Sequence, residues 1–184
     1  MESKEKNTKE KILEEALKLF AQSGYMGTSM NDIASKLGVT KAALYKHYKS
    51  KQEILDSIIE KMNELDIERV KLYEMPEGDL EKVTAGYKET AFDKIKQFTK
   101  VQFLHWTEEE FSSCFRKMLT LEQYREPQMA QLYQNYLASG PLAYMEALFS
   151  GMLGDAEKAR QTALDFYGPI FLLYSIYDGA EDKL

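Results

Sequence analysis

Apolar residues recur three and four positions apart through the first third of the chain, which is the pattern of amphipathic helices. Such a stripe covers residues 8–23, and Gly24 is placed to end that helix in a left-handed conformation. The pattern resumes over 30–37 and 41–47, and again from residue 51 to about 74. The sequence therefore predicts three helices followed by a longer fourth one.

Capping residues precede the last three of these helices, since their side-chain oxygens can accept hydrogen bonds from the free N–H groups of a first turn. Ser50 and Glu53 have the spacing of a capping box, and Ser29 with Asp32 has the same spacing with a shorter acid. The predicted caps are Thr28 or Ser29 for the second helix, Thr40 for the third and Ser50 for the fourth.

The remaining two-thirds of the chain also has helical spacing, without the alternating β-branched runs that are typical of a sheet. The expected helices are roughly 80–105, 108–119, 121–138, 141–153 and 155–178. Gly168-Pro169 lies inside the last segment and is expected to kink it. We therefore predict an all-α fold.

The connection between the second and third helices predicts a helix-turn-helix. Ala34 is small where the two helices cross, and Gly38 can take the positive φ of a tight turn. Val39 and Leu44 are expected to fill the core beneath that turn. The third helix would then project outward, in the manner of a helix that enters the major groove of DNA.

The third helix is expected to present lysines, small residues and aromatic donors. Lys41 or Lys46 can donate to guanine O6 and N7, and Ala42 or Ala43 can touch a thymine methyl group. Thr40, Tyr45, His47 and Lys51 are placed to hydrogen-bond phosphates. The start of the fourth helix, at Lys51, adds free backbone N–H groups for a phosphate. The candidate DNA-binding residues are Thr28, Ser29, Thr40, Lys41, Ala42, Ala43, Tyr45, Lys46, His47 and Lys51.

The charge distribution agrees with a DNA-binding head, although the net charge is −6. Residues 1–51 hold ten lysines and six acids, a net of +4, and the rest of the chain has a net of −10. Such asymmetry is typical of a basic DNA-reading part on an acidic body. The alternative interpretation is a small helical hairpin with a solvated lysine face and no DNA.

The segment from Ile12 to Leu55 resembles the N-terminal domain of the TetR family of transcriptional repressors. The matching residues are Ile12 to Phe20, Gly24-Tyr25, Thr28-Ser29, Asp32-Ile33-Ala34, Gly38-Val39-Thr40, Leu44-Tyr45, His47-Tyr48 and Lys51 to Leu55. The resemblance implies a dimer of nine or ten helices per chain. It also implies a helix-turn-helix DNA-binding domain at 1–52 and a ligand-binding and dimerisation domain at 53–184, with ligand releasing DNA.

Aromatic residues and methionines cluster in the larger part, where an apolar cavity with a few polar groups is the usual small-molecule site. For any single residue, simple core packing is the competing interpretation. The density of tyrosines favours a polar-tipped pocket, because buried hydroxyls need partners. The candidate pocket residues are Phe98, Gln102, Trp106, Phe115, Met118, Tyr133 and Phe166, with Ile95 on the same helix face as the first three.

The segment from Ala163 to Tyr177 is too apolar for an exposed helix. From the residues alone a buried core helix competes with a dimer surface formed with Pro141 to Met152, and the resemblance favours a homodimer through the last two helices. No apolar run reaches the ~20 residues of a membrane span. A single cysteine, Cys114, and the absence of a secretory signal predict the cytoplasm.

Other chemistry has little support in the sequence. His105 lies near Glu108, Glu109 and Glu110 and could chelate a metal, but a surface histidine beside an acidic cap is the preferred interpretation. Cys114 has no nearby partner and is expected to be buried. We expect no cofactor and no enzymatic activity, because no nucleophile–base pair or phosphate-binding glycine loop is present.

The predicted function is a repressor that a small apolar or amphipathic molecule releases from a palindromic, double-stranded operator. Ligand would favour a body conformation in which the two recognition helices no longer fit half-sites about 34–36 Å apart. The alternative is a DNA-bound regulator or architectural protein that a protein partner controls, with no small-molecule inducer.

Overall fold

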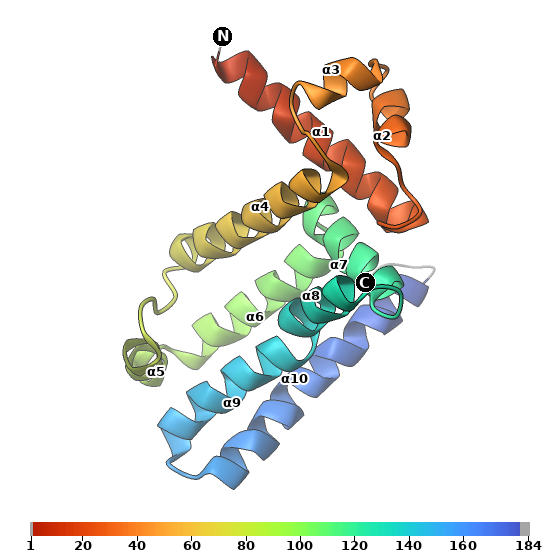
Figure 1. The fold of residues 1–184 in the computed structure, drawn as a ribbon. Helices are drawn as coiled ribbons and strands as arrows, with labels where there is room; N and C mark the ends of the chain where they lie inside the picture. Colours follow the sequence, from red (N-terminus) through yellow and green to blue (C-terminus); the bar gives the residue numbers. More distant parts are fainter. Residues whose placement is uncertain (1, 181–184) are drawn as a thin grey trace. The chain divides into compact units, whose positions relative to one another are not determined.

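The computed structural model describes residues 2–180, and the side chains from residue 7 onward. Within these residues the fold is entirely helical, as predicted, with no strand (Figure 1). The helices are α1 (Glu2–Ser23), α2 (Met30–Lys36), α3 (Lys41–Tyr45), α4 (Lys51–Leu72), α5 (Leu80–Glu89), α6 (Phe92–Thr107), α7 (Glu110–Glu122), α8 (Pro127–Leu137), α9 (Ser139–Leu153) and α10 (Ala156–Gly179).

The helices group into two compact units. Unit 1 consists of the described residues up to Asp66 together with Glu110–Ala130, and unit 2 consists of Ile67–Glu109 and Gln131 onward. Unit 1 therefore holds α1, α2, α3 and α7, whereas unit 2 holds α5, α6, α9 and α10. The chain passes between the units three times: within α4, between α6 and α7, and within α8, so the last residues of α4 belong to unit 2.

The core of unit 1 comes from the apolar stripes that the sequence predicts. Leu17 and Phe20 of α1 are almost completely buried, as are Ile58 of α4 and Phe115 of α7. Helix α1 packs along α7, although the two are nearly a hundred positions apart in the chain. Burying a large apolar side chain contributes about 1.5–3 kcal/mol, so these contacts stabilise unit 1.

Two glycines of unit 1 take the positive φ that the sequence predicts. Gly24 ends α1 with φ +82°, and Gly38 joins α2 to α3 with φ +67°. Their surroundings differ: a Cβ on Gly24 would overlap the carboxylate oxygen Oε1 of Glu122, whereas a Cβ on Gly38 would meet nothing within 4 Å.

The capping pattern is confirmed for α2 and α3. Ser29 Oγ accepts from Asp32 N at 3.2 Å, and the Asp32 carboxylate accepts from Ser29 N at 2.8 Å, which completes the capping box. Thr40 Oγ1 accepts from Ala43 N at 3.2 Å at the start of α3. The second capping box differs in part, because Glu53 accepts from Lys49 N instead of the cap residue's own N–H.

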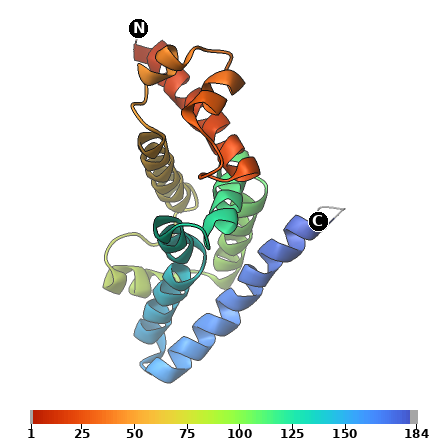
Figure 2. The ribbon, with the colours of Figure 1, turned by 45° about the vertical axis from the view of Figure 1, so that its right-hand side comes forward.

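In unit 2, α9 and α10 run side by side in opposite directions, and both ribbon views show this pairing (Figure 2). Phe103 of α6 stacks on Tyr174 of α10 with ring centroids 5.5 Å apart. Gly168-Pro169 lies inside α10, and the helix continues through Pro169, as the sequence predicts. None of the described helices has a stretch long and apolar enough to cross a membrane.

Four expectations from the sequence are wrong. Cys114, expected to be buried, is half-buried. The single helix predicted over 80–105 is two helices, because Thr90 takes an extended conformation after α5, and no glycine or proline marks that break. Val39 is 43% exposed and does not fill the core under the turn, whereas Leu44 is buried as predicted. His105 is completely buried and not a surface histidine.

A polar cluster explains the burial of His105. The guanidinium of Arg69, itself buried, donates to the ring of His105 and to Gln102 Oε1 at 3.0 Å. The Glu109 carboxylate lies 2.7 Å from His105 Nδ1. These contacts tie the end of α4 to α6 inside unit 2, and they offset the cost of burying a charge.

Substituting the two turn glycines separates backbone strain from steric overlap. We expect Gly24→Ala to lower the free energy of unfolding by about 2–5 kcal/mol, because it adds overlap with Glu122 to the cost of a left-handed alanine. Gly38→Ala is the matched control and should cost about 1–2 kcal/mol, the strain alone. Urea unfolding measures both values, and equal losses would contradict the stated role of Glu122.

Candidate nucleic-acid interface

Helix α3 has only five residues and is held to unit 1 by few anchors. Leu44 is 1% exposed, and Tyr48, just beyond the helix, is 4% exposed. On the other side of the connection, Ala34 is buried and its carbonyl accepts from Val39 N at 3.0 Å. A short helix with one buried row leaves its remaining positions facing outward.

The outward positions carry the residues that the sequence predicts for a groove. Thr40, Lys41, Ala42 and Lys46 are exposed, and Tyr45 is 40% exposed. Lys41 Nζ lies 5.8 Å from the centroid of the Tyr45 ring, within the range of a cation–π contact. The structure thus brings two ammonium groups, a phenol and a small side chain together on one exposed face.

Two residues of the predicted set on α3 or directly after it are less accessible. Ala43 and His47 are half-buried and line a pocket on the side of α3 that faces α1. Nδ1 of His47 is buried without a hydrogen-bond partner in the described part of the chain. These two positions therefore differ from the fully outward orientation expected for them.

The residues before α2 have their polar groups engaged within unit 1. Thr28 is 3% exposed, and its hydroxyl donates to the carbonyl of Gly24 at 2.9 Å. Ser29 is exposed, but its hydroxyl donates to Asp32 Oδ2 at 2.6 Å. The hydrogen bonds from the Ser29 hydroxyl and the Ser29 backbone N–H lower the pKa of the Asp32 carboxyl below its ordinary value.

Lys51 has a similar internal role at the start of α4. Its ammonium donates to the carbonyl oxygens of Tyr25 at 2.5 Å and Thr28 at 2.8 Å, and it lies 4.3 Å from the centroid of the Tyr25 ring. Burial lowers the pKa of Lys51, and the negative charge of Glu122 opposes that shift. Lys51 therefore ties the α1–α2 connection to α4.

Glu122 is the residue of this region that sequence reasoning missed. It is completely buried at the end of α7, with Oε1 accepting from Arg125 at 3.2 Å. It lies against Gly24 and exerts its charge on Lys51. The burial of this acid could not be predicted from the sequence, because Gly24 and Lys51, against which it lies or acts, are about 70 to 100 positions away in the chain.

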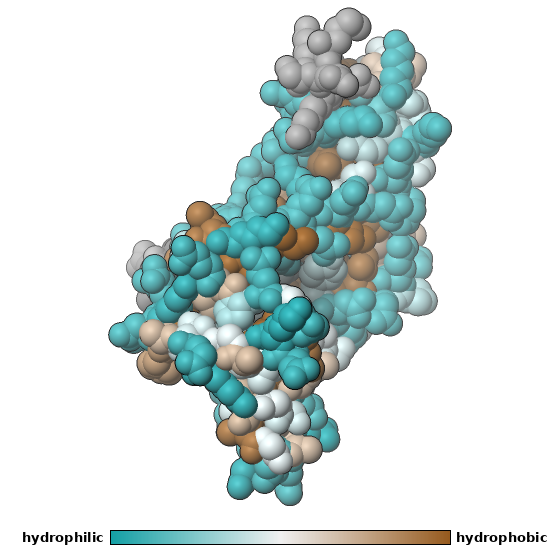
Figure 3. Space-filling view, turned by 90° about the vertical axis from the view of Figure 1, so that its left-hand side faces the viewer, coloured by the Kyte–Doolittle hydropathy of each residue, from teal (hydrophilic) through white to brown (hydrophobic). Residues whose placement is uncertain are grey.

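The exposed surface around α3 is basic. Lys36, Lys41, Lys46 and Lys49 are all exposed, and none of the four belongs to an ion pair found in this part of the structure. On the face drawn in Figure 3, hydrophilic side chains predominate and hydrophobic ones lie in small groups between them. Clustered lysines without neutralising acids create a positive potential that attracts polyanions.

The candidate ligand-pocket residues are divided between the units. Phe115 and Met118 are fully buried in unit 1. The other five belong to unit 2, where Trp106 lies 6.4 Å from Tyr136 and Gln102 accepts from Arg69. The described residues contain no group of three or more side chains suited to hold a metal ion.

Together, α2, the Gly38 turn and the exposed α3 form a helix-turn-helix motif. Residues 12–58 match the family model of "Bacterial regulatory proteins, tetR family". This match covers about a quarter of the chain, from the middle of α1 into α4.

Known relatives agree over the same segment. The chain is 42% identical over 52 residues to the biofilm operon icaADBC HTH-type negative transcriptional regulator IcaR of Staphylococcus epidermidis, which is 28% of each protein. It is 41% identical over 51 residues to IcaR of Staphylococcus aureus (strain Newman), with 28% of this chain and 27% of that protein covered. The chain thus matches little more than a quarter of the length of these relatives.

Solved structures include a transcriptional regulator with a similar helical fold. A transcriptional regulator of the TetR/AcrR family from Thermobifida fusca aligns with a TM-score of 0.52 and 21% identity, over 97% of this chain and 89% of that one. This similarity concerns the fold alone.

Removing the Lys51 ammonium tests its internal role. We expect Lys51→Met to lower the free energy of unfolding by about 1–3 kcal/mol, because the carbonyls of Tyr25 and Thr28 lose a charged donor. Lys49→Met is the matched control at an exposed position and should stay within about 0.5 kcal/mol of the parent. Equal denaturation midpoints for parent and Lys51→Met would refute the role.

Proposed function

We propose that the chain is a transcriptional regulator of the repressor type that reads double-stranded DNA with α3. The observation that carries this proposal is the outward face of α3, where Lys41, Tyr45 and Lys46 are exposed while Leu44 anchors the helix from below. The name of the IcaR relatives as negative regulators supports repression. The exposed helix has the position from which a helix-turn-helix enters the major groove.

The residues of the exposed face divide into two roles. Lys41 or Lys46 donates to guanine O6 and N7, and Ala42 touches a thymine methyl group. Thr40 and Tyr45 hydrogen-bond phosphates and set the orientation of the helix. Thr28, Ser29 and Lys51 support this face from within, because their polar groups hold the turns before α2 and α4.

A homodimer through α9 and α10 would supply the second recognition helix. Apolar side chains of α10 are exposed in one protomer, and a partner surface would remove them from water. They are Leu164, Phe171, Leu172, Leu173 and Ile176. Two-fold symmetry implies a palindromic operator.

In functional terms we divide the chain into a DNA-binding part, 1–52, and a dimerisation and effector part, 53–184.

We also propose that a small apolar or amphipathic molecule controls DNA binding through unit 2. The support is the combination of aromatic rings with a buried polar cluster between α4 and α6, where Arg69, Gln102 and His105 meet. A ligand that favours one arrangement of α4 against α6 would shift the population of DNA-competent dimers. A regulator controlled by a protein partner shares the same DNA-binding face.

Substitutions on α3 test the DNA-reading face. DNA selected from a random pool serves as the probe, and fluorescence anisotropy measures affinity at several salt concentrations. We expect Tyr45→Ala to weaken binding to all sequences and Lys41→Ala to weaken binding by about 5- to 150-fold while relaxing preference at one base pair. Both substitutions are at exposed positions, so helix content should not change.

Lys100→Ala is the matched control, because Lys100 is an exposed lysine of α6 in unit 2. Its affinity and its dependence on salt should equal those of the parent. Binding that is insensitive to salt, or equal losses for Lys41→Ala and Lys100→Ala, would contradict reading by α3.

A further inference from the structure

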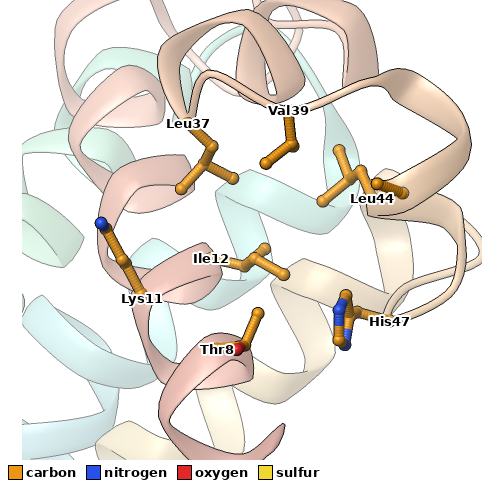
Figure 4. A pocket seen from close by; sticks show the side chains of 8 residues that line it. Thr8, Lys11, Ile12, Leu37, Val39, Leu44 and His47 are labelled. Carbon is orange, nitrogen blue, oxygen red and sulfur yellow. The ribbon is translucent and has the colours of Figure 1, made fainter. Parts of the chain in front are cut away.

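A pocket of about 230 Å³ lies within unit 1, between α1 and the connection from α2 to α3 (Figure 4). Ile12 of α1 forms one wall, Leu37 and Val39 of the connection form another, and Leu44 closes the base. Because Val39 is 43% exposed, an occupant would cover apolar surface that is now in contact with water. All of the lining residues belong to unit 1, so the pocket is distinct from any effector site in unit 2.

The accessible polar groups of this pocket lie at its rim. Thr8 and Lys11 of α1 both contribute to the lining, and both are exposed. Lys11 extends along the side opposite His47, so its methylene groups can cover apolar wall while its ammonium remains in water (Figure 4). Nδ1 of His47 is itself buried and therefore not open to an occupant. The charged group available at the rim is thus the Lys11 ammonium.

The charges around the pocket favour an anion. Lys11 belongs to none of the ion pairs found among the described residues, and none of the residues that line the pocket is acidic. Lys36 and Lys46, next in the chain to Leu37 and His47 of the lining, are exposed as well. Lysines gathered in this way create a positive potential that raises the local concentration of anions.

We propose that this pocket binds a small monocarboxylate with an apolar body, such as benzoate. The ring would lie against Ile12 and Val39, and the carboxylate would pair with the Lys11 ammonium at the rim. An apolar protein cavity of about 150 Å³ admits benzene, so this pocket has room for one ring, yet it is smaller than the sites of drug-sized ligands. A charge at the rim keeps most of its water, so the pairing avoids the cost of burying an ion.

The pocket is also adjacent to the DNA-reading face. Val39, Ala43 and His47 belong to the Gly38 turn and to α3 or its immediate continuation, whereas Lys11 belongs to α1. A carboxylate at Lys11 would lower the positive potential beside α3, and benzoate should therefore weaken operator binding. This consequence rests on the proposed function, and by linkage DNA would lower the affinity for benzoate by the same factor.

The test is an NMR titration of the full chain without DNA. Benzoate and benzyl alcohol are the probes, because they share the ring and have nearly the same size but only benzoate is charged. We expect saturable shifts in the methyl signals of Ile12, Val39 and Leu44 with both probes, and tighter binding of benzoate. Sodium chloride at equal ionic strength is the reference for screening and should not reproduce these shifts.

A pair of matched lysine variants tests the charge at the rim. Lys11→Met keeps an unbranched side chain and removes the ammonium, so it should lower the affinity for benzoate about fivefold and leave that for benzyl alcohol within about twofold. Lys9→Met is the control, because Lys9 is exposed on the same helix and does not line the pocket. It should leave both affinities within about twofold of the parent.

A third variant tests the location of the ring. Val39→Trp should fill the pocket and abolish saturation with both probes, and the exposure of Val39 leaves room for the larger side chain. If Val39→Trp fails to fold, as judged by circular dichroism, the comparison of Lys11→Met with Lys9→Met decides alone.

The proposal is overturned if benzoate causes no saturable shifts beyond those of sodium chloride, or if the shifts persist unchanged in folded Val39→Trp. It is also overturned if Lys11→Met and Lys9→Met weaken benzoate binding equally, or if the parent binds benzoate and benzyl alcohol equally well. Because the titration contains no DNA, these outcomes are independent of whether α3 reads an operator. A separate anisotropy titration with benzoate measures the coupling to DNA, and an absence of DNA binding there would count against the proposed function alone.

Discussion

The burial of Leu44 is the interaction on which the proposed DNA-reading face depends. A helix of five residues has too few internal hydrogen bonds to persist alone, so packing must hold α3 in place. The Gly38 turn directs Leu44 into the core, and the same turn directs Lys41, Tyr45 and Lys46 to solvent. One anchored row thus fixes which side chains a nucleic acid would meet.

Buried polar groups determine the geometry around this anchor. Lys51 joins the carbonyls before α2 to the start of α4, and the charge of Glu122 stabilises the Lys51 ammonium from α7. Gly24 is required beside Glu122, because any side chain there would occupy the space of the carboxylate. Helices that are far apart in the chain are therefore fixed by a few directional contacts in addition to apolar packing.

Features set by near neighbours in the chain could be predicted from the sequence, and those set by distant ones could not. The helical stripes, the Ser29–Asp32 capping box and the Gly24 and Gly38 turns depend on residues within a few positions. The burial of His105 depends on its contact with Arg69, 36 positions away, within unit 2. Charge and composition alone do not encode such contacts.

The same distinction applies to the site. The exposure of Lys41 and Tyr45 follows from helical spacing around Leu44. The internal roles of Thr28 and Lys51 could not be predicted from the sequence, because a threonine and a lysine in a basic segment are equally compatible with phosphate contacts.

Chemical acylation of lysines, read by mass spectrometry with and without selected operator DNA, tests the central claim, that α3 reads DNA, most directly. DNA should strongly protect Lys41 and Lys46 and leave Lys100 unchanged, whereas equal reactivity of Lys41 and Lys46 in both samples would contradict an α3 that reads DNA.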